Sequence, residues 1–238
     1  CAKGINFLLT NGGRIEDYHG HGKAEKPMLP SIGVPTTAGT GSEAQSYALI
    51  SQAETHVKMA CGDRKARFRV VILDPDLVGS APHSVKAAAG YDAMAHAVES
   101  YVCTKANEVS RMYAREGMRL LNGALERFVD GETGECEEEM LLGAHFAGTS
   151  IESSMLGAAH ACANPLSAEY GTAHGVAVGV MLPVVVDYNM RNQAQRYAGL
   201  LGDPDLSARL REIRSRLGLP NSLGALNVGS DQIPGLAA

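Results

Sequence analysis

The sequence predicts an α/β unit followed by an all-α unit, with the boundary near residue 82. Before that point, short apolar runs alternate with loops rich in glycine and proline, and the run RVVIL at 69–73 predicts a buried strand. After it, alanine-rich patterns with helical spacing take over. We therefore expect residues 1–82 to form the C-terminal part of an α/β domain, and residues 83–238 to form a helical domain.

The individual elements follow from the same patterns. Residues 1–10 indicate the end of a helix, 31–35 a strand, and 47–50 with 57–61 a hairpin. We expect Pro165 to stop the helix that carries His160, because proline lacks a backbone donor, and Asp203–Pro204 to begin the last helix. Apolar residues at helical spacing predict helices at about 84–103, 110–128, 136–161, 174–181, 190–201 and 205–217.

The composition narrows the class of protein. The chain has 238 residues, 45% of them hydrophobic, which indicates a folded protein with a core. A formal net charge of -5 without a basic run argues against nucleic acid as a partner, and the longest apolar stretch, 176–186, is too short to cross a membrane. Five cysteines without a CxxC pair, and the lack of a signal peptide, predict reduced thiols and a cytoplasmic location.

Four side chains in the second half could bind a metal. Asp92 and His96 are four residues apart, so a helix places them on one face, and the alanines around them indicate that this face is buried. A surface pair or a packing histidine is the alternative. His160 and His174 could meet at a helix–loop–helix turn, although their spacing fixes no geometry and a structural histidine is the commoner case. One carboxylate with three imidazoles suits Fe²⁺, Zn²⁺, Co²⁺ or Ni²⁺ rather than Ca²⁺ or Mg²⁺.

A loop after the first strand could bind phosphate. It reads TTAGTGSE at 36–43, where Gly39 and Gly41 allow close backbone approach and the hydroxyls can donate to phosphate oxygens. It matches neither GxGxxG nor a Walker loop, so a solvated tight turn is an equal alternative. The remaining histidines are given structural roles: His19, His21, His56, His83 and His145.

Together, these motifs resemble the iron-containing (group III) alcohol dehydrogenases. The matching strings occur in the same order along nearly the whole chain: PTTAGTGSE at 35–43, LDPDL at 73–77, GYDAMAHAVESY at 90–101, and His160 through His174–Gly175 to Leu182–Pro183. In that family, a Gly-Gly-Gly-Ser loop that holds the pyrophosphate precedes the helix whose end is found here at Cys1. We therefore expect this chain to be a piece of a longer protein that binds the dinucleotide poorly by itself.

The resemblance implies a fold and a set of site residues. The fold is a partial Rossmann-like nucleotide-binding domain (1–82) followed by a helical metal-binding domain (83–238), the architecture shared with dehydroquinate synthase, with the site between them. The implied metal ligands are Asp92, His96, His160 and His174. The residues implied to contact NAD or NADP are Thr36, Thr40 and Lys58, with Leu49 close by; Thr37 and Ser42 are counted with them as neighbouring hydroxyls of the same loop.

One position departs from the family pattern. Many members have a further histidine four residues after the third ligand, and here that position is Asn164. An amide can orient a hydroxyl or a water molecule, but it cannot shuttle a proton near neutral pH. Asn164 is therefore a catalytic candidate with a changed role.

The activity implied by the resemblance is hydride transfer between NAD(P) and an alcohol, giving an aldehyde or ketone, with Fe²⁺, Zn²⁺ or another divalent transition metal as Lewis acid. The expected partner is a small alcohol or aldehyde, and the sequence also allows a homodimer. Two alternatives stay open. One is a zinc-dependent relative of the same fold, such as a glycerol dehydrogenase or a dehydroquinate-synthase-like enzyme. The other is a catalytically incomplete metal-binding fragment.

Overall fold

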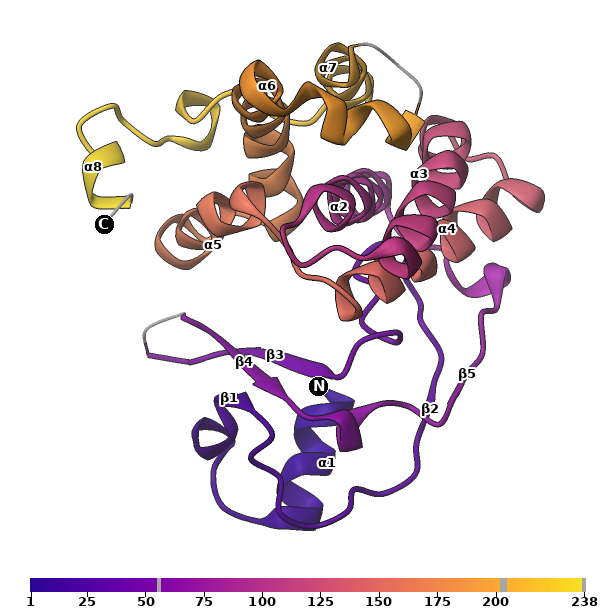
Figure 1. The fold of residues 1–238 in the computed structure, drawn as a ribbon, viewed down its shortest axis with the longest axis vertical. Helices are drawn as coiled ribbons and strands as arrows, with labels where there is room; N and C mark the ends of the chain where they lie inside the picture. The colour runs from indigo at the N-terminus through magenta and orange to yellow at the C-terminus, as the bar shows by residue number, and fades with distance from the viewer. Residues whose placement is uncertain (55–56, 202–204, 237–238) are drawn as a thin grey trace.

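The computed structural model describes residues 1–54, 57–201 and 205–236. A small unit contains α1 and the strands, and a larger unit contains the helices from α2 onward (Figure 1). The turn expected at His56 and the helix start expected at Asp203–Pro204 lie outside the described residues. Within the described ranges, no helix combines the length and apolar character needed to cross a bilayer.

The small unit is built on a hairpin, as the sequence predicts. Strand β3 (Tyr47–Ser51) runs antiparallel to β4 (Lys58–Gly62), and β1 (Gly20–His21) pairs parallel with the other edge of β4. Helix α1 (Ala2–Asn11) and a 3₁₀ turn at 15–18 pack on this sheet. The unit has its own small core, in which the rings of Phe7 and Tyr18 lie 5.0 Å apart.

A strand forms within 69–73, but the prediction that it is buried is wrong. The structure has a two-residue strand, β5 (Val70–Val71), which pairs parallel with β2 (Ile32–Gly33) and with no other strand among the described residues. Val70 is 51% exposed and Ile72 is 49% exposed. An apolar strand is buried only when other elements cover its faces, and the sequence of the strand does not reveal whether they do.

The helical unit is arranged around α2 (His83–Val102), which lies in the middle of the other helices (Figure 1). Every residue of α2 from Gly90 to Tyr101 is buried, and the small side chains along it let the neighbouring helices approach closely. The surrounding elements are α3 (Glu108–Val129), α4 (Glu135–Glu152), α5 (Ala158–Tyr170), α6 (His174–Leu201), α7 (Leu206–Arg216) and the short α8 (Ile233–Leu236).

Several predicted helix boundaries are wrong. The helix expected at 136–161 is two helices, because α4 ends at Glu152 and α5 begins at Ala158. The helices expected at 174–181 and 190–201 both lie in α6, but the break between them is at Gln193, where the backbone is non-helical and kinked, rather than at 182–189. Pro165 does not stop α5, which continues to Tyr170 and ends at Gly171 with a φ of 62°. A proline inside a helix removes one hydrogen bond, and tertiary packing can tolerate that loss.

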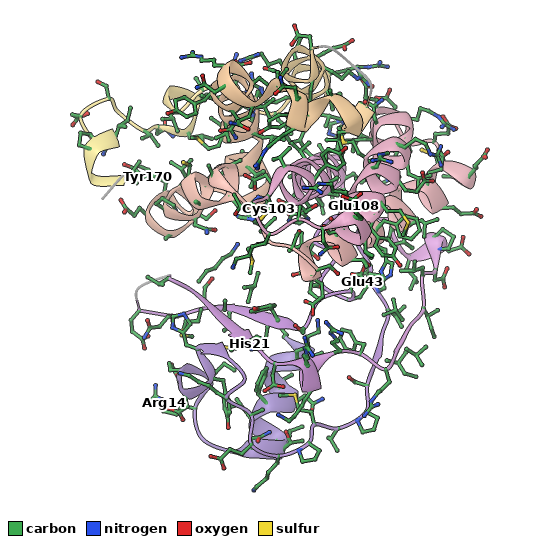
Figure 2. The ribbon with its side chains drawn as sticks, viewed as in Figure 1. Arg14, His21, Glu43, Cys103, Glu108 and Tyr170 are labelled. Carbon is green, nitrogen blue, oxygen red and sulfur yellow. The ribbon has the colours of Figure 1, made fainter. Side chains whose placement is uncertain are left out.

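The loop at 36–46 packs against the helical unit. A Cβ on Gly39 would lie 2.6 Å from the Cβ of Ala89 on α2, and a Cβ on Gly41 would lie 2.6 Å from the Cα of Gly148 on α4. Only glycine allows the backbones to approach this closely. Glu43 lies at this boundary (Figure 2), where its carboxylate is 3.0 Å from Nδ1 of His145. The loop is thus packed on α2 and α4, and the N–H of Asp63, which donates to the carbonyl of Ser46 at 3.1 Å, also ties it to the small unit.

A second contact ties the two units together. The Glu152 carboxylate at the end of α4 accepts a hydrogen bond from the backbone N–H of Ser46 at 2.9 Å and one from Nε of Arg67 at 3.0 Å. The Ser46 hydroxyl also donates to it at 3.1 Å. The boundary near residue 82 stays a prediction, although several residues before it are packed on the helices.

Candidate metal centre

Helix α2 presents two of the predicted metal ligands on one face. Asp92 and His96 are one helical turn apart, and Oδ2 of Asp92 lies 3.5 Å from Nε2 of His96. Both side chains are buried, and Asp92 is only 4% exposed. Because a buried carboxylate without a partner is costly, this position indicates that something compensates its charge.

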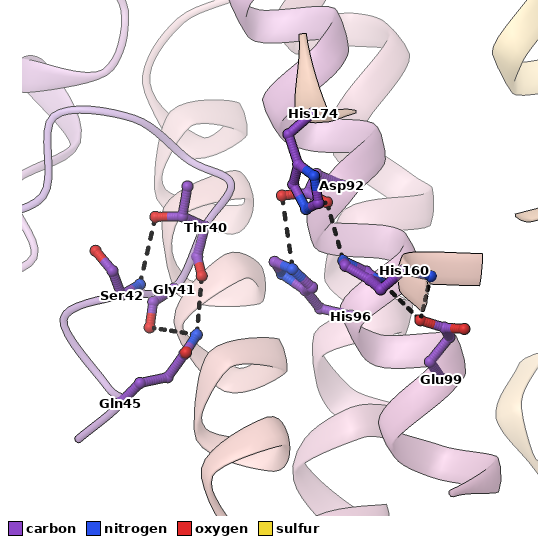
Figure 3. A network of polar contacts seen from close by, with 9 residues as sticks. All are labelled: Thr40, Gly41, Ser42, Gln45, Asp92, His96, Glu99, His160 and His174. Carbon is purple, nitrogen blue, oxygen red and sulfur yellow. Dashed lines mark hydrogen bonds and ion pairs between the residues drawn. The ribbon is translucent and has the colours of Figure 1, made fainter. Parts of the chain in front are cut away.

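Helices α5 and α6 bring the other two imidazoles to the same carboxylate (Figure 3). His160 is in the first turn of α5, and its Nε2 lies 3.3 Å from Oδ1 of Asp92. His174 is the first residue of α6, and its Nε2 lies 3.8 Å from the same oxygen. The rings of His96 and His160 are stacked with their centres 4.9 Å apart. The structure therefore gathers all four side chains from three helices.

The polar atoms at this point have room for a cation. Ligand atoms of Asp92, His96 and His160 all lie within 4.8 Å of one another. Oδ1 of Asp92 and Nε2 of His160 are buried and have no hydrogen bond among the described residues. Buried polar atoms are normally satisfied, so a shared cation explains two unsatisfied atoms that face each other. Carboxylate and imidazole donors fit a divalent transition metal.

The centre keeps a negative charge on Asp92. Burial raises the pKa of this carboxyl, but the imidazoles of His96 and His160 outweigh burial and hold the pKa below its usual value. Burial lowers the pKa of His96, and it lowers the pKa of His174 to about 4. Burial also acts on His160, but the negative charges of Asp92 and Glu99 outweigh it and raise its pKa to about 9, so a bound cation would take the place of the proton on Nε2. The ionised carboxylate is the group that attracts a cation here.

The loop beside the centre carries the predicted hydroxyls. Figure 3 shows Thr40 and Ser42 on the loop that faces Asp92 and His96, and both residues are exposed. The backbone behind them is fixed, because Nε2 of Gln45 donates to the carbonyl of Thr40 at 3.0 Å. The ammonium of Lys3 on α1 donates to the carbonyls of Ser42 and Gln45, and burial lowers the pKa of Lys3 to about 8.

The other predicted nucleotide contacts lie on the loop and on the hairpin. Thr36 is exposed at the beginning of the loop, and Thr37 is half-buried. Leu49 on β3 is 54% exposed. Lys58 begins β4; burial lowers its pKa, and the negative charge of Asp92 opposes that effect.

Two family models match the chain and together cover most of it. The model of the iron-containing alcohol dehydrogenases matches residues 1–75, and the C-terminal model of the Fe-containing alcohol dehydrogenase family matches residues 86–238. The chain belongs to the iron-containing alcohol dehydrogenase family.

Individual relatives agree with this assignment. Alcohol dehydrogenase 4 of Schizosaccharomyces pombe is 40% identical over 92% of this chain and 49% of its own length. The NAD-dependent methanol dehydrogenase of Bacillus methanolicus is 37% identical over 83% of this chain and 52% of its own length. A crystal structure of a 1,3-propanediol oxidoreductase superposes with a TM-score of 0.94 at 31% identity, covering 100% of this chain and 66% of that one. The chain thus spans about half of these curated relatives, and the predicted fold class is confirmed.

Asn164 lies one helical turn after His160. The two residues share a face of α5, and Asn164 is exposed. Its amide is therefore open to solvent on the side of the helix that carries His160. The structure leaves its catalytic role as a prediction.

The sequence reasoning missed Glu99. This residue follows His96 by three positions, so Asp92, His96 and Glu99 continue one face of α2, and that spacing was a signal that could have revealed it. Glu99 is 3% exposed and contacts His160 through the ring nitrogen that faces away from Asp92 (Figure 3). It is an acidic residue beside the site that is not in the predicted ligand set.

Proposed function

We propose that this chain forms the metal-binding and substrate-binding part of an NAD(P)-dependent alcohol dehydrogenase. The observation that carries the proposal is the convergence of Asp92, His96, His160 and His174 beside a fixed, hydroxyl-bearing loop. Family membership supports the reaction class, and the relatives named above act on small alcohols by their names. A small alcohol, or the aldehyde or ketone derived from it, is therefore the proposed substrate class.

Four side chains would hold the metal: Asp92, His96, His160 and His174. Fe²⁺ is the proposed ion because of the family, and Zn²⁺ or another divalent transition metal suits the same donors. When bound, the metal supplies Lewis-acid polarisation of the substrate oxygen. The buried alanine-rich surroundings of α2 limit the access of bulk water to Asp92 and His96, which strengthens electrostatic interactions at the site.

The residues of the small unit would orient the dinucleotide. The hydroxyls of Thr36, Thr40 and Ser42 can donate to its polar oxygens, and the ammonium of Lys58 can meet a ribose or phosphate oxygen. Thr37 and Leu49 would complete the contact. NAD is the proposed cofactor because the methanol dehydrogenase relative is named as NAD-dependent, and its nicotinamide supplies the hydride acceptor. Asn164 would orient a hydroxyl or water molecule without carrying the proton itself.

The test compares the full chain with two histidine variants. We expect wild-type protein, purified without added metal, to contain close to one equivalent of a divalent transition metal. His160→Ala removes a ligand, so both metal retention and NAD-dependent oxidation of a small alcohol should be lost. His83→Ala changes an exposed histidine at the beginning of α2, and this variant should keep both metal retention and activity. Full activity of His160→Ala without bound metal would refute the proposal.

The same assay separates the alternatives. Turnover of a phosphorylated sugar acid in place of a simple alcohol would indicate the dehydroquinate-synthase-like reaction. Preference for glycerol with zinc bound would indicate the glycerol dehydrogenase branch. Metal binding without any turnover would indicate an incomplete fragment. The cytoplasmic location, supported by five free cysteines, stays a proposal, and the homodimer stays a prediction of the sequence.

A further inference from the structure

Glu99 is a buried carboxylate that joins α2 to the beginning of α5. Its Oε1 accepts a hydrogen bond from the backbone N–H of Ala159 at 2.6 Å, and its Oε2 accepts one from the backbone N–H of His160 at 3.3 Å. These N–H groups belong to the first turn of α5, where helical donors have no partner within the helix. Glu99 thus caps α5 from another helix.

The same carboxylate also holds the imidazole of His160. Oε2 of Glu99 lies 2.5 Å from Nδ1 of this ring, and Nε2 on the other side of the ring lies 3.3 Å from Oδ1 of Asp92. A carboxylate that accepts the proton of Nδ1 leaves Nε2 as the free lone pair, and so fixes both the tautomer and the direction of the ring. Glu99 therefore determines which ring nitrogen faces the metal centre.

The neighbouring backbone is shaped around this carboxylate. A Cβ on Gly157 would lie only 2.9 Å from Oε1 of Glu99, so the residue that precedes α5 leaves just enough space for the acid. The space left by Gly157, the hydrogen bonds to the first turn of α5 and the contact with the His160 ring all fix the two carboxylate oxygens of Glu99.

We propose that Glu99 is a positioning residue that holds His160 toward Asp92 and thereby sets the affinity of the centre for a divalent transition metal. The inference rests on the proposed metal site, and it adds a residue outside the four ligands. Carboxylates that orient a ligating histidine typically change metal affinity 10–100-fold when they are removed.

The chain contains a matched control: a buried glutamate that caps a helix but lies away from the metal centre. Glu137 on α4 is also buried, and its Oε2 accepts a hydrogen bond from the N–H of Gly134 at 3.0 Å. Glu137 has no histidine contact among the described residues. Glu137→Gln therefore measures the loss of a buried helix cap without a change at the metal centre.

The experiment measures zinc affinity of the full chain by competition with a chromophoric chelator. Glu99→Gln should bind Zn²⁺ about 10–100-fold more weakly than wild type, and Glu137→Gln should stay within about twofold. In a His160→Ala background, the three remaining ligands should bind zinc too weakly to keep it through purification but still measurably at higher zinc concentration. Glu99→Gln should lower this residual affinity no further, because the ring that it positions is absent. As a readout independent of any variant's folding, NMR of the zinc-loaded wild type should show the proton of His160 on Nδ1.

Specific results would overturn the inference. If Glu99→Gln binds zinc as tightly as wild type, Glu99 acts only as a helix cap. The same conclusion follows if Glu99→Gln lowers the zinc affinity of His160→Ala as much as it lowers that of wild type. A proton on Nε2 of His160 in the zinc-loaded protein would lead to the same conclusion. Wild-type protein that binds no zinc and none of the other divalent transition metals would overturn the proposed function itself, and the inference would fall with it.

Discussion

The two units of this chain differ in how their apolar residues are buried. The helical unit has a continuous core around α2, with Tyr91, Met94 and Leu121 fully enclosed. The small unit has a compact cluster around Phe7, while Ile32 of β2 and Val70 of β5 are exposed. Both units contain apolar runs, and the difference in burial depends on which elements cover those runs.

This difference explains where the site residues lie. All four predicted metal ligands come from the helical unit, where a dense core holds side chains in single conformations. The loop at 36–46 belongs to the small unit in sequence, but Ala38 within it is part of the helical core. Both halves of the site therefore depend on the helices, and among the predicted site residues the strands contribute Lys58 and Leu49 only.

The largest expected loss of stability comes from cavities in the two cores, and zinc binding should distinguish one core from the other. Phe128→Ala in the helical core and Phe7→Ala in the small core should each cost about 3–5 kcal/mol of local stability, because each leaves a cavity. Only Phe128→Ala should weaken zinc binding, since the ligands are held by the helices. Urea unfolding together with zinc titration measures both properties. Loss of zinc affinity in Phe7→Ala would contradict the contrast between the two units.

A smaller effect is expected where the loop meets the helices. Gly41 has a φ of 56°, and a Cβ there would lie 2.9 Å from the carbonyl oxygen of Ala144, so Gly41→Ala combines backbone strain with a clash. We expect the free energy of unfolding of Gly41→Ala to fall by about 2–4 kcal/mol. Gly218→Ala is the control, because Gly218 has a φ of 67° and a Cβ there would meet no heavy atom within 4 Å. It should cost about 1 kcal/mol. Equal losses in urea unfolding would mean that the loop is not packed on α4.

The contact of Glu152 with Ser46 and Arg67, which joins the two units, predicts that the stability of the fold depends on pH. Burial raises the pKa of Glu152, but the hydrogen bonds from Ser46 and Arg67 outweigh it, so the pKa lies below its usual value. A lowered carboxyl pKa stabilises the fold above the unfolded pKa of about 4.3, and this contribution is lost as pH falls through the folded pKa.

Glu152→Gln should therefore cost about 1–2 kcal/mol at pH 7, and the difference from wild type should shrink as pH falls below about 4.5. Urea unfolding at several pH values measures it. Glu138→Gln, at an exposed position of the same helix, should show no such trend. A constant difference between Glu152→Gln and wild type at all pH values would mean that the charge of Glu152 does not join the units.

The smallest expected effect concerns the exposed strand. Val70→Thr on β5 should change stability by less than about 0.5 kcal/mol, whereas Val178→Thr in the helical core should cost about 1–2 kcal/mol, because it buries a hydroxyl. Thermal or urea unfolding of the two variants measures this. A loss above about 1 kcal/mol in Val70→Thr would show that another surface covers β5 in solution.

The local features were predictable because they depend on residues close in sequence. The hairpin at 47–62 follows from two apolar runs separated by a turn, and the shared face of Asp92 and His96 follows from helix geometry. The helical character of the second half was visible in its periodicity. The ordered family motifs indicated the fold class, which the solved relatives confirm.

Features that depend on residues distant in sequence were not predictable. Pro165 suggested a helix end, but α5 continues through it within the packed helical unit. The run at 69–73 suggested burial, but no described element covers its outer face. Glu99 and His160 are 61 residues apart, and nothing in either local sequence indicates that they meet.

The sequence alone established which side chains could bind a metal and which helix face carries the first two, because helical spacing is a local property of the backbone. The folded arrangement was needed to show that α5 and α6 begin beside Asp92, that Glu99 contacts the ring of His160, and that the loop at 36–46 packs on α2 and α4. The reason is that the free energy of packing depends on contacts between distant segments, and these exist only once the chain has folded.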